Sequence, residues 1–155
     1  MKKKTRIMFL GIVLLLVVAM SGCGVNQKTP ESVVESLVKS YVDGSEKKVK
    51  KCYTQETDTN ELLQKEIDAT MKYFAAHEPS KVKVDKCDTL SENEDYTYVY
   101  ILYNLVLSND QEYPCIGTYM VKKDGSKYYV MAPSEITDDL RKQAAADYAK
   151  FMTTD

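Results

Sequence analysis

The sequence predicts an α+β fold, in which N-terminal helices pack on a curved, four-stranded antiparallel sheet and one more helix follows the sheet. Apolar residues recur with a helical period up to residue 76, and they alternate with polar residues after Pro79. Hairpin signals such as Asp124-Gly125 separate the alternating segments. Helices and strands that are segregated along a chain are typical of the α+β class, so we expect the helices to cover one face of the sheet.

The helical part divides into three predicted helices. Thr29 can cap the first helix, and Asp43-Gly44 can end it because glycine readily adopts a left-handed conformation. Pro79 ends the third helix, because proline disfavours helical geometry in the residue before it. The three helices are expected at 30–42, 45–51 and 61–76.

Four alternating segments follow and predict the strands. The longest segment, 96–107, has apolar side chains at both odd and even positions, so we expect both faces of this strand to be at least partly covered. Gly117 lies inside a predicted strand, where a glycine marks a bulge or a strong bend. The strands are expected at 81–87, 96–107, 113–122 and 127–131.

The N-terminus has the charge and hydropathy order of a secretory signal peptide. Lysines and an arginine within residues 2–6 precede an apolar run over 7–20, and small residues follow it. At about 1.5 Å per residue this run reaches roughly 21 Å, which is shorter than the ~30 Å hydrocarbon core of a bilayer. The run is therefore better suited to export than to permanent membrane spanning.

The last residue of the apolar run and the three that follow it, Met20-Ser21-Gly22-Cys23, resemble the lipobox of bacterial lipoproteins. The resemblance implies that residues 1–22 are a lipoprotein signal peptide, that Cys23 carries a diacylglyceryl group and acyl chains such as palmitate, and that 23–29 form a lipidated tether. The protein would then be anchored by lipid to the extracytoplasmic face of the cell membrane, since two or more acyl chains hold a protein stably. The alternative is a secreted protein with a free cysteine near its N-terminus.

The predicted mature chain is acidic. Removing residues 1–22 takes four of the 21 basic residues and none of the 23 acidic ones, which leaves 133 residues with a net charge of −6. This length suits one domain, which we place at 30–152. The charge argues against nucleic acid as a partner and against tight binding to anionic lipid head groups.

A last helix is expected at 135–152, opened by Pro133-Ser134. The order of three helices, hairpin-connected strands and a helix, with Val42-Asp43-Gly44 ending the first helix and Cys52-Tyr53 following the second, resembles the nuclear-transport-factor-2-like (NTF2-like) or cystatin-like cone over about 30–131. Many small bacterial lipoproteins of unknown function look alike in this way. The last helix could cap the mouth of the cone, cross the open face of the sheet, or pack outside, and its position decides whether a pocket exists.

Three cysteines, Cys52, Cys87 and Cys115, remain after Cys23 is assigned to lipid. They can be small buried hydrophobic residues, or one pair at most, Cys52 with Cys87 or with Cys115, can form a disulfide in an exported protein. A catalytic thiol is the least favoured reading, because His77 is the only histidine and suits a helix end. No metal-ligand spacing and no nucleotide motif occurs, so we expect no metal and no cofactor.

Tyrosine is the unusual residue type, with 12 Tyr against three Phe and no Trp. Tyrosines on the predicted strands could face a ligand, because each ring combines apolar area with a polar tip. The alternative is that they sit at the edge of a core with their hydroxyl groups in water. The candidate ligand-facing residues are Tyr96, Tyr98, Tyr100, Tyr119 and Tyr128.

Two classes of function remain open. The first is a membrane-anchored binding module without catalytic residues, whose partner is a protein, a peptide or a glycan. The second is a small cone-fold enzyme, isomerase- or dehydratase-like, that acts on an exported apolar substrate. Such enzymes resemble this chain in fold and place an Asp in the cavity, but Asp68, Asp85 and Asp95 are expected to face solvent. A buried carboxylate in a pocket would favour the enzyme, and we predict the binding module.

Overall fold

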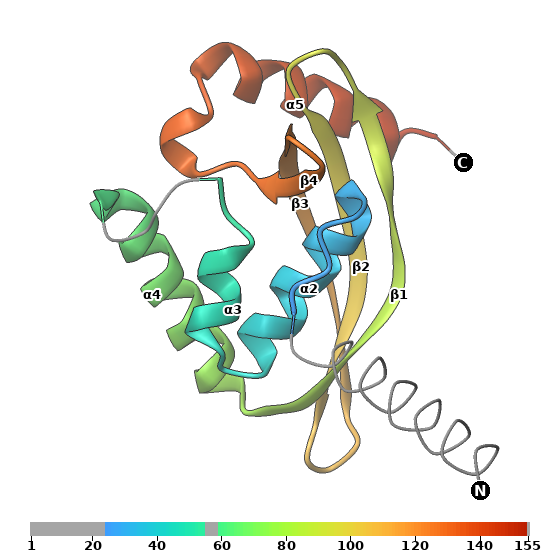
Figure 1. Ribbon diagram of the computed structural model, residues 1–155. Coiled ribbons are helices and arrows are strands. Elements are labelled where there is room, and N and C mark those ends of the chain that lie inside the picture. Colours follow the sequence, from blue (N-terminus) through green and yellow to red (C-terminus); the bar gives the residue numbers. More distant parts are fainter. Residues whose placement is uncertain (1–23, 55–58, 155) are drawn as a thin grey trace, which may run out of the picture.

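The computed structural model describes residues 24–54 and 59–154, and Figure 1 shows a four-stranded sheet between helices. The predicted signal peptide and the lipobox cysteine Cys23 lie outside the described residues. Helices α2 and α4 lie on one side of the sheet, with α3 between them in sequence, and α5 lies on the other side. Among the described helices, none is both long and apolar enough to cross a membrane. The predicted α+β fold class is confirmed.

The three N-terminal helices are α2 (Pro30–Val42), α3 (Glu46–Lys51) and α4 (Glu61–His77). Their ends follow from local chemistry. The Thr29 hydroxyl accepts from the Ser32 N–H at 3.1 Å, and the Ser32 hydroxyl accepts from the Thr29 N–H at 3.0 Å, which closes a capping box. Gly44 has φ +67°, the left-handed conformation that the sequence predicted at the end of the first helix.

The sheet is an antiparallel meander in the order β1-β2-β3-β4. Its strands are β1 (Pro79–Glu92), β2 (Thr97–Leu107), β3 (Glu112–Asp124) and β4 (Lys127–Val130). Strand β1 is twice as long as the predicted 81–87. Its pairing with β2 shifts register three times, and each shift breaks the alternation of side chains, so the sequence pattern of a strand can be recognised only in the middle of β1.

Gly117 does not mark a bulge, because β2 and β3 pair without a register shift from Thr97↔Val121 to Val106↔Glu112. The glycine instead makes room for an aromatic ring on the same strand. A Cβ atom at position 117 would lie 3.0 Å from Cε2 of Tyr119 and 3.4 Å from Cγ2 of Ile101. The ring of Tyr119 therefore covers the bare backbone of Gly117, and of the two expectations for this glycine, a bulge or a strong bend, the bulge is wrong.

Both faces of β2 are covered, as the sequence predicted. Its odd-numbered residues, including Val99 and Ile101, pack in a large core with α2 and α4. On the other face, Tyr98 and the residue just before the strand, Tyr96, pack in a second, smaller core with Ala144 of α5. Of the three positions considered for the last helix, the structure shows the one across the open face of the sheet (Figure 1).

Helix α5 covers Asp138–Met152 and so begins three residues later than predicted. The chain first makes a separate 3-10 turn, η2 (Pro133–Glu135), and is extended at Ile136. Thr137 then caps α5 by accepting from the N–H of Leu140 at 3.3 Å. The turn stops β4 and redirects the chain onto the opposite face of the sheet.

The described part of the predicted tether, residues 24–29, is bound to the domain. The Asn26 N–H donates to Ser36 Oγ at 3.1 Å, and the Gln27 side chain donates to the Lys51 carbonyl at 3.1 Å. The Tyr128 N–H donates to the Gln27 carbonyl at 3.0 Å. The segment predicted as a polar spacer therefore leaves little free chain between position 23 and the domain surface.

Candidate functional site

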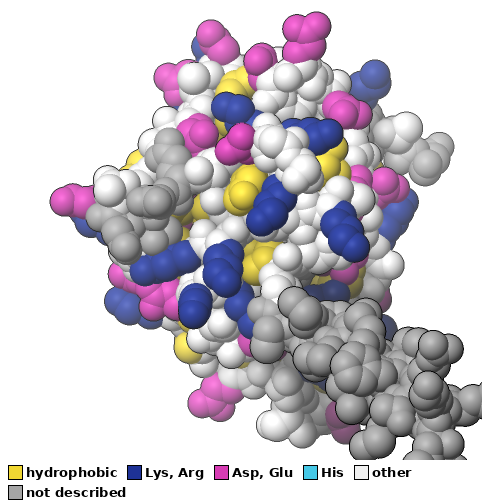
Figure 2. All heavy atoms as spheres, viewed as in Figure 1, with side chains coloured by type: hydrophobic (Ala, Val, Ile, Leu, Met, Phe, Trp, Pro, Cys, Tyr) yellow, Lys and Arg dark blue, Asp and Glu magenta, His cyan; other side chains and the backbone are white. Residues whose placement is uncertain are grey.

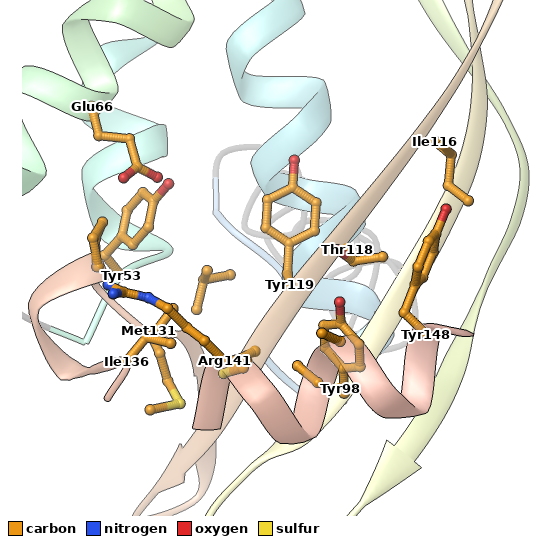
Figure 3. A pocket seen from close by; sticks show the side chains of 15 residues that line it. Tyr53, Glu66, Tyr98, Ile116, Thr118, Tyr119, Met131, Ile136, Arg141 and Tyr148 are labelled. Atoms are coloured by element: carbon orange, nitrogen blue, oxygen red, sulfur yellow. The ribbon is translucent and has the colours of Figure 1, made fainter. Parts of the chain in front are cut away.

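A cleft with a volume of about 530 Å³ opens beside β3, between α4 and α5 (Figure 3). Its lining comes from five regions: the segment after α3, the middle of α4, the start of β2, the central part of β3, and the stretch from the end of β4 into α5. The residues that shape its chemistry are Tyr53, Glu66, Tyr98, Ile116, Tyr119, Arg141 and Tyr148.

Tyr53 forms the first wall and is held from several sides. Its backbone bridges to Val130 at the end of β4, where the Val130 N–H donates to the Cys52 carbonyl at 2.7 Å and the Thr54 N–H donates to the Val130 carbonyl at 3.1 Å. Its hydroxyl lies 3.1 Å from the hydroxyl of Tyr41, and both residues are buried. This wall is therefore preorganised by strand pairing and by a buried hydrogen bond.

Glu66 projects from α4 toward the hydroxyl of Tyr53 (Figure 3). The side chain keeps contact with solvent at the mouth of the cleft, and partial burial raises the pKa of its carboxyl group. Burial also raises the pKa of Tyr53, with further contributions from Tyr41 and Glu66. The carboxyl group of Glu66 is thus the acid of the site whose protonation the fold favours.

Strand β3 lines the cleft from both of its faces. Tyr119 projects toward α2 and the large core, and burial is the main cause of its raised pKa. Met120 projects to the opposite side, into the core beneath α5. Ile116 and Thr118 share the parity of Met120 and also line the cleft, with Ile116 exposed to solvent. The cleft therefore wraps around the edge of β3.

Helix α5 provides the remaining wall. Ala144, Ala145 and Tyr148 lie along its side that faces the cleft, and the small alanines leave the space open. Arg141 extends from the same side, and its guanidinium donates to Asp138 at 3.1 Å while staying largely exposed. The cleft thus combines an aromatic and aliphatic lining with one carboxylate and one guanidinium at its rim.

The five tyrosines that the sequence singled out fall in different places. Tyr98 and Tyr119 line the cleft from opposite faces of the sheet. Tyr96 is buried beneath α5, and Tyr100 packs its ring 4.6 Å from that of Phe151. Tyr128 packs against the large core and carries the Lys123 ammonium 5.5 Å above its ring. The structure does not gather these tyrosines into one wall.

The described cysteines are free thiols. Cys52 is buried, whereas Cys87 and Cys115 are half-buried. Burial raises the pKa of Cys52 and of Cys87 to about 12, which keeps both groups protonated at neutral pH and suits a structural role. No cluster of three or more His, Cys, Asp and Glu side chains that could hold a metal ion occurs within residues 24–54 and 59–154.

Sequence reasoning missed Glu66 and Arg141, because each reads as part of a solvated helix face. One signal was present for Glu66. Thr70, one turn further along α4, is the single polar member of an otherwise apolar stripe, and it hydrogen-bonds with Tyr41. A polar position in a buried stripe indicates a polar neighbourhood, and Glu66 borders it. Asp68, Asp85 and Asp95 are exposed, as expected.

The fold and the site together define an α+β domain with a solvent-open, tyrosine-lined cleft. A solved structure of similar fold is described as a "Putative NTF2-like transpeptidase" from Campylobacter jejuni, with a TM-score of 0.47 and 15% sequence identity over 66% of this chain and 97% of that chain. No known protein family matches the sequence, and no curated protein does so either. A likeness at this level carries no argument about activity or ligand.

Proposed function

We propose that the protein is a membrane-anchored, extracytoplasmic binding module whose ligand occupies the cleft between α4 and α5. The lipobox resemblance at Met20-Ser21-Gly22-Cys23 supports the anchor. The observation that carries the binding role is the cleft itself, which is open to solvent and offers aromatic rings, hydroxyl groups and two opposite charges. Such a mixture of apolar lining and a few placed polar groups is typical of ligand sites.

The cleft favours a ligand with both apolar and polar groups. The side chains of Tyr148 and Ile116 offer apolar surface, whereas Glu66 of α4 and Arg141 of α5 can each meet a complementary charge. A protein, peptide or glycan segment has groups of this kind, in keeping with the partners expected from the sequence. The short bound segment at residues 24–29 would hold the cleft close to the membrane surface.

An enzyme is the second candidate, and Glu66 is the observation that favours it. A carboxyl group with a raised pKa beside a tyrosine hydroxyl could act as a general acid or base. Its exposure favours the binding role, because catalytic carboxyl groups usually lie in sites from which water is excluded. Glu66→Gln distinguishes the enzyme from the binding module. It would abolish turnover of a substrate but change the affinity for an uncharged ligand by no more than a few-fold.

The anchor is tested with Cys23→Ala in cells supplied with a palmitate analogue. The wild-type chain should incorporate the label and fractionate with membranes, whereas Cys23→Ala should lose the label and either leave the membrane or remain as an unprocessed precursor. Cys115→Ala removes a half-buried thiol of the domain and is the matched control, which should behave as wild type. Unchanged labelling of Cys23→Ala would contradict the lipoprotein proposal.

The binding site is tested by filling the cleft from α5. Ala145→Trp places an indole in the cleft, whereas Ala146→Trp places the same group on an exposed position of the same helix that points away from it. Ligand-observed NMR with the full chain in detergent would screen glycan, small-molecule and peptide libraries. Ligands found in the screen should bind the wild type and Ala146→Trp, and their binding should be lost in Ala145→Trp. Ligands that bind Ala145→Trp as tightly as the wild type would show that the cleft is not their binding site.

A further inference from the structure

The edge of β3 that borders the cleft is unpaired. Strand β4 pairs only with Val121–Asp124, and the last hydrogen bond on this side runs from the Met131 N–H to the Met120 carbonyl at 2.9 Å. Beyond it, β3 continues back to Glu112 with β2 on its other side. None of the described residues pairs with this half of the strand, so its outward backbone groups have no strand partner.

The alternation of backbone direction along β3 shows which N–H and C=O groups point to the unpaired edge. The Met120 carbonyl points to the β4 side, and the backbone groups of alternate residues point the same way. Thr118 and Ile116 therefore present their N–H and C=O groups to the open edge, and Pro114 presents a carbonyl but no N–H. A proline is tolerated in a strand where its missing donor faces outward, which fits this assignment.

The cleft lies along this edge. Ile116, Thr118, Tyr119 and Met120 all line it, and the walls stand on either side of the strand, Tyr53 and Glu66 toward α4 and Tyr148 toward α5 (Figure 3). A segment placed here would continue the line of β4 past Val130. Its successive side chains would point alternately toward these two walls.

We propose that the cleft binds an extended peptide, which adds to the free edge of β3 as a strand in continuation of β4. This inference rests on the proposed binding function and names the class of ligand. Thr118 and Ile116 supply the main-chain hydrogen bonds. The α5 wall, with Ile116, Ala145 and Tyr148, accepts aliphatic side chains, and the opposite wall, with Glu66, accepts a lysine or an arginine by charge complementarity.

The probe is a library of capped peptides of about seven residues, the length of an ordinary strand. Valine occupies alternate positions, and lysine, arginine, serine or threonine occupies the others. Binding to the fluorescent peptides is measured by anisotropy with the full chain in detergent. A second library carries N-methyl groups on alternate backbone nitrogens, in one register or in the other, because only one register donates to β3.

The protein variants address the same backbone groups. Thr118→Pro removes the outward N–H without breaking a hydrogen bond to β2, and Thr118→Val keeps that N–H and is the matched control. We expect Thr118→Pro to weaken binding by about fivefold to thirtyfold, which corresponds to one or two backbone hydrogen bonds. Thr118→Val should bind as wild type. Peptides methylated on the nitrogens that face β3 should not bind, whereas peptides methylated on the other set of alternate nitrogens should bind as the unmethylated peptides do.

The outcomes separate this inference from the proposed function. Peptides that are lost with Ala145→Trp but are insensitive to Thr118→Pro and to N-methylation would leave the cleft as a binding site and overturn strand addition. Strand addition would also be overturned if no peptide bound up to about 1 mM while other ligands still bound the wild type and failed to bind Ala145→Trp. Concentration-dependent self-association that Thr118→Pro abolishes would assign the edge to a second copy of the chain and overturn the peptide proposal.

Discussion

The buried pair of Tyr41 and Tyr53 gives a quantitative prediction about the wall of the cleft. Their hydroxyl oxygens lie 3.1 Å apart, and the residues are only 3% and 6% exposed. Replacing one tyrosine by phenylalanine removes one partner and leaves the other hydroxyl buried. A net hydrogen bond contributes about 1 kcal/mol, and an unsatisfied buried group costs about 1–3 kcal/mol, so each single variant should lose about 2 kcal/mol.

The double variant should lose less than the sum of the two single losses. Once both hydroxyls are gone, no buried polar group is left unsatisfied, so the total loss should be about 2–3 kcal/mol, against about 4 kcal/mol for independent sites. The free energy of unfolding is measured by urea denaturation of the full chain in detergent, followed by circular dichroism. At about 4 °C per kcal/mol, the single variants should also melt about 8 °C lower.

Additivity of the two substitutions would refute the reasoning, because it would mean that the hydroxyl groups do not depend on each other. Tyr113→Phe is the control, since Tyr113 is 49% exposed and its hydroxyl should contribute less than about 0.5 kcal/mol. The hydroxyl of Tyr41 has a second neighbour in Thr70, so Tyr53→Phe should be the milder of the two single changes.

Three further predictions concern stability. Gly44→Val should cost about 2 kcal/mol in urea unfolding, purely through backbone strain, because φ is +67° and no heavy atom lies within 4 Å of the new Cβ; an unchanged midpoint would contradict the left-handed cap. Gly117→Val should cost about 1–3 kcal/mol through overlap with the Tyr119 ring, and a smaller loss would show that the ring moves aside freely. Burial raises the pKa of Cys52 and of Tyr41 to about 12, from 9.0 and 10.0, so their contribution is complete below pH 9 and should be lost as the pH rises toward 12. Ionisation of Tyr41, measured as the difference in tyrosinate absorbance between the wild type and Tyr41→Phe, should therefore coincide with the loss of the circular dichroism signal, and ionisation of Tyr41 in a still-folded protein would argue against these assignments.

The order of the elements could be predicted from sequence because each one carries a local signal. Thr29 and Gly44 define the ends of α2, and the run of β-branched, aromatic and aliphatic residues at 96–107 defines β2. This run is apolar at both odd and even positions, which also predicted that both faces of the strand are covered. Local signals fail where partners shift register, which is why only part of β1 was found.

The cleft could not be predicted, because it depends on where distant elements meet. Glu66 and Arg141 occupy ordinary positions on helix surfaces, and they become neighbours of one cavity only because α4 and α5 stand on either side of the β3 edge. Nothing in the periodicity of α5 states which face of the sheet it covers. Of the tyrosines singled out from the sequence, Tyr98 and Tyr119 line the cleft, whereas Tyr96 and Tyr100 pack beneath α5.

The basic surface visible in Figure 2 bears on how the domain would be oriented at a membrane. Lysine side chains gather over the face that carries α2 and α3, interspersed with acidic groups. The segment at residues 24–29 is bound beside Lys51, on α3, and beside Tyr128, on β4. A lipid at position 23 would therefore bring these elements toward the membrane, which would orient the domain without requiring tight binding to head groups.

The open edge of β3 follows from the short sequence that ends β4. After Val130 the chain does not continue the hairpin, because Ala132 and Pro133 enter a 3-10 turn that the Glu135 carboxylate closes by accepting from the Ala132 N–H at 2.8 Å and from the hydroxyl of Thr54. The turn sends the chain across to α5, and α5 then covers the far face but not the edge. An unpaired edge is normally a liability for aggregation. Here the cleft beside the edge is lined by residues of α4 and α5, so an extended segment bound to Thr118 and Ile116 would also contact both helices.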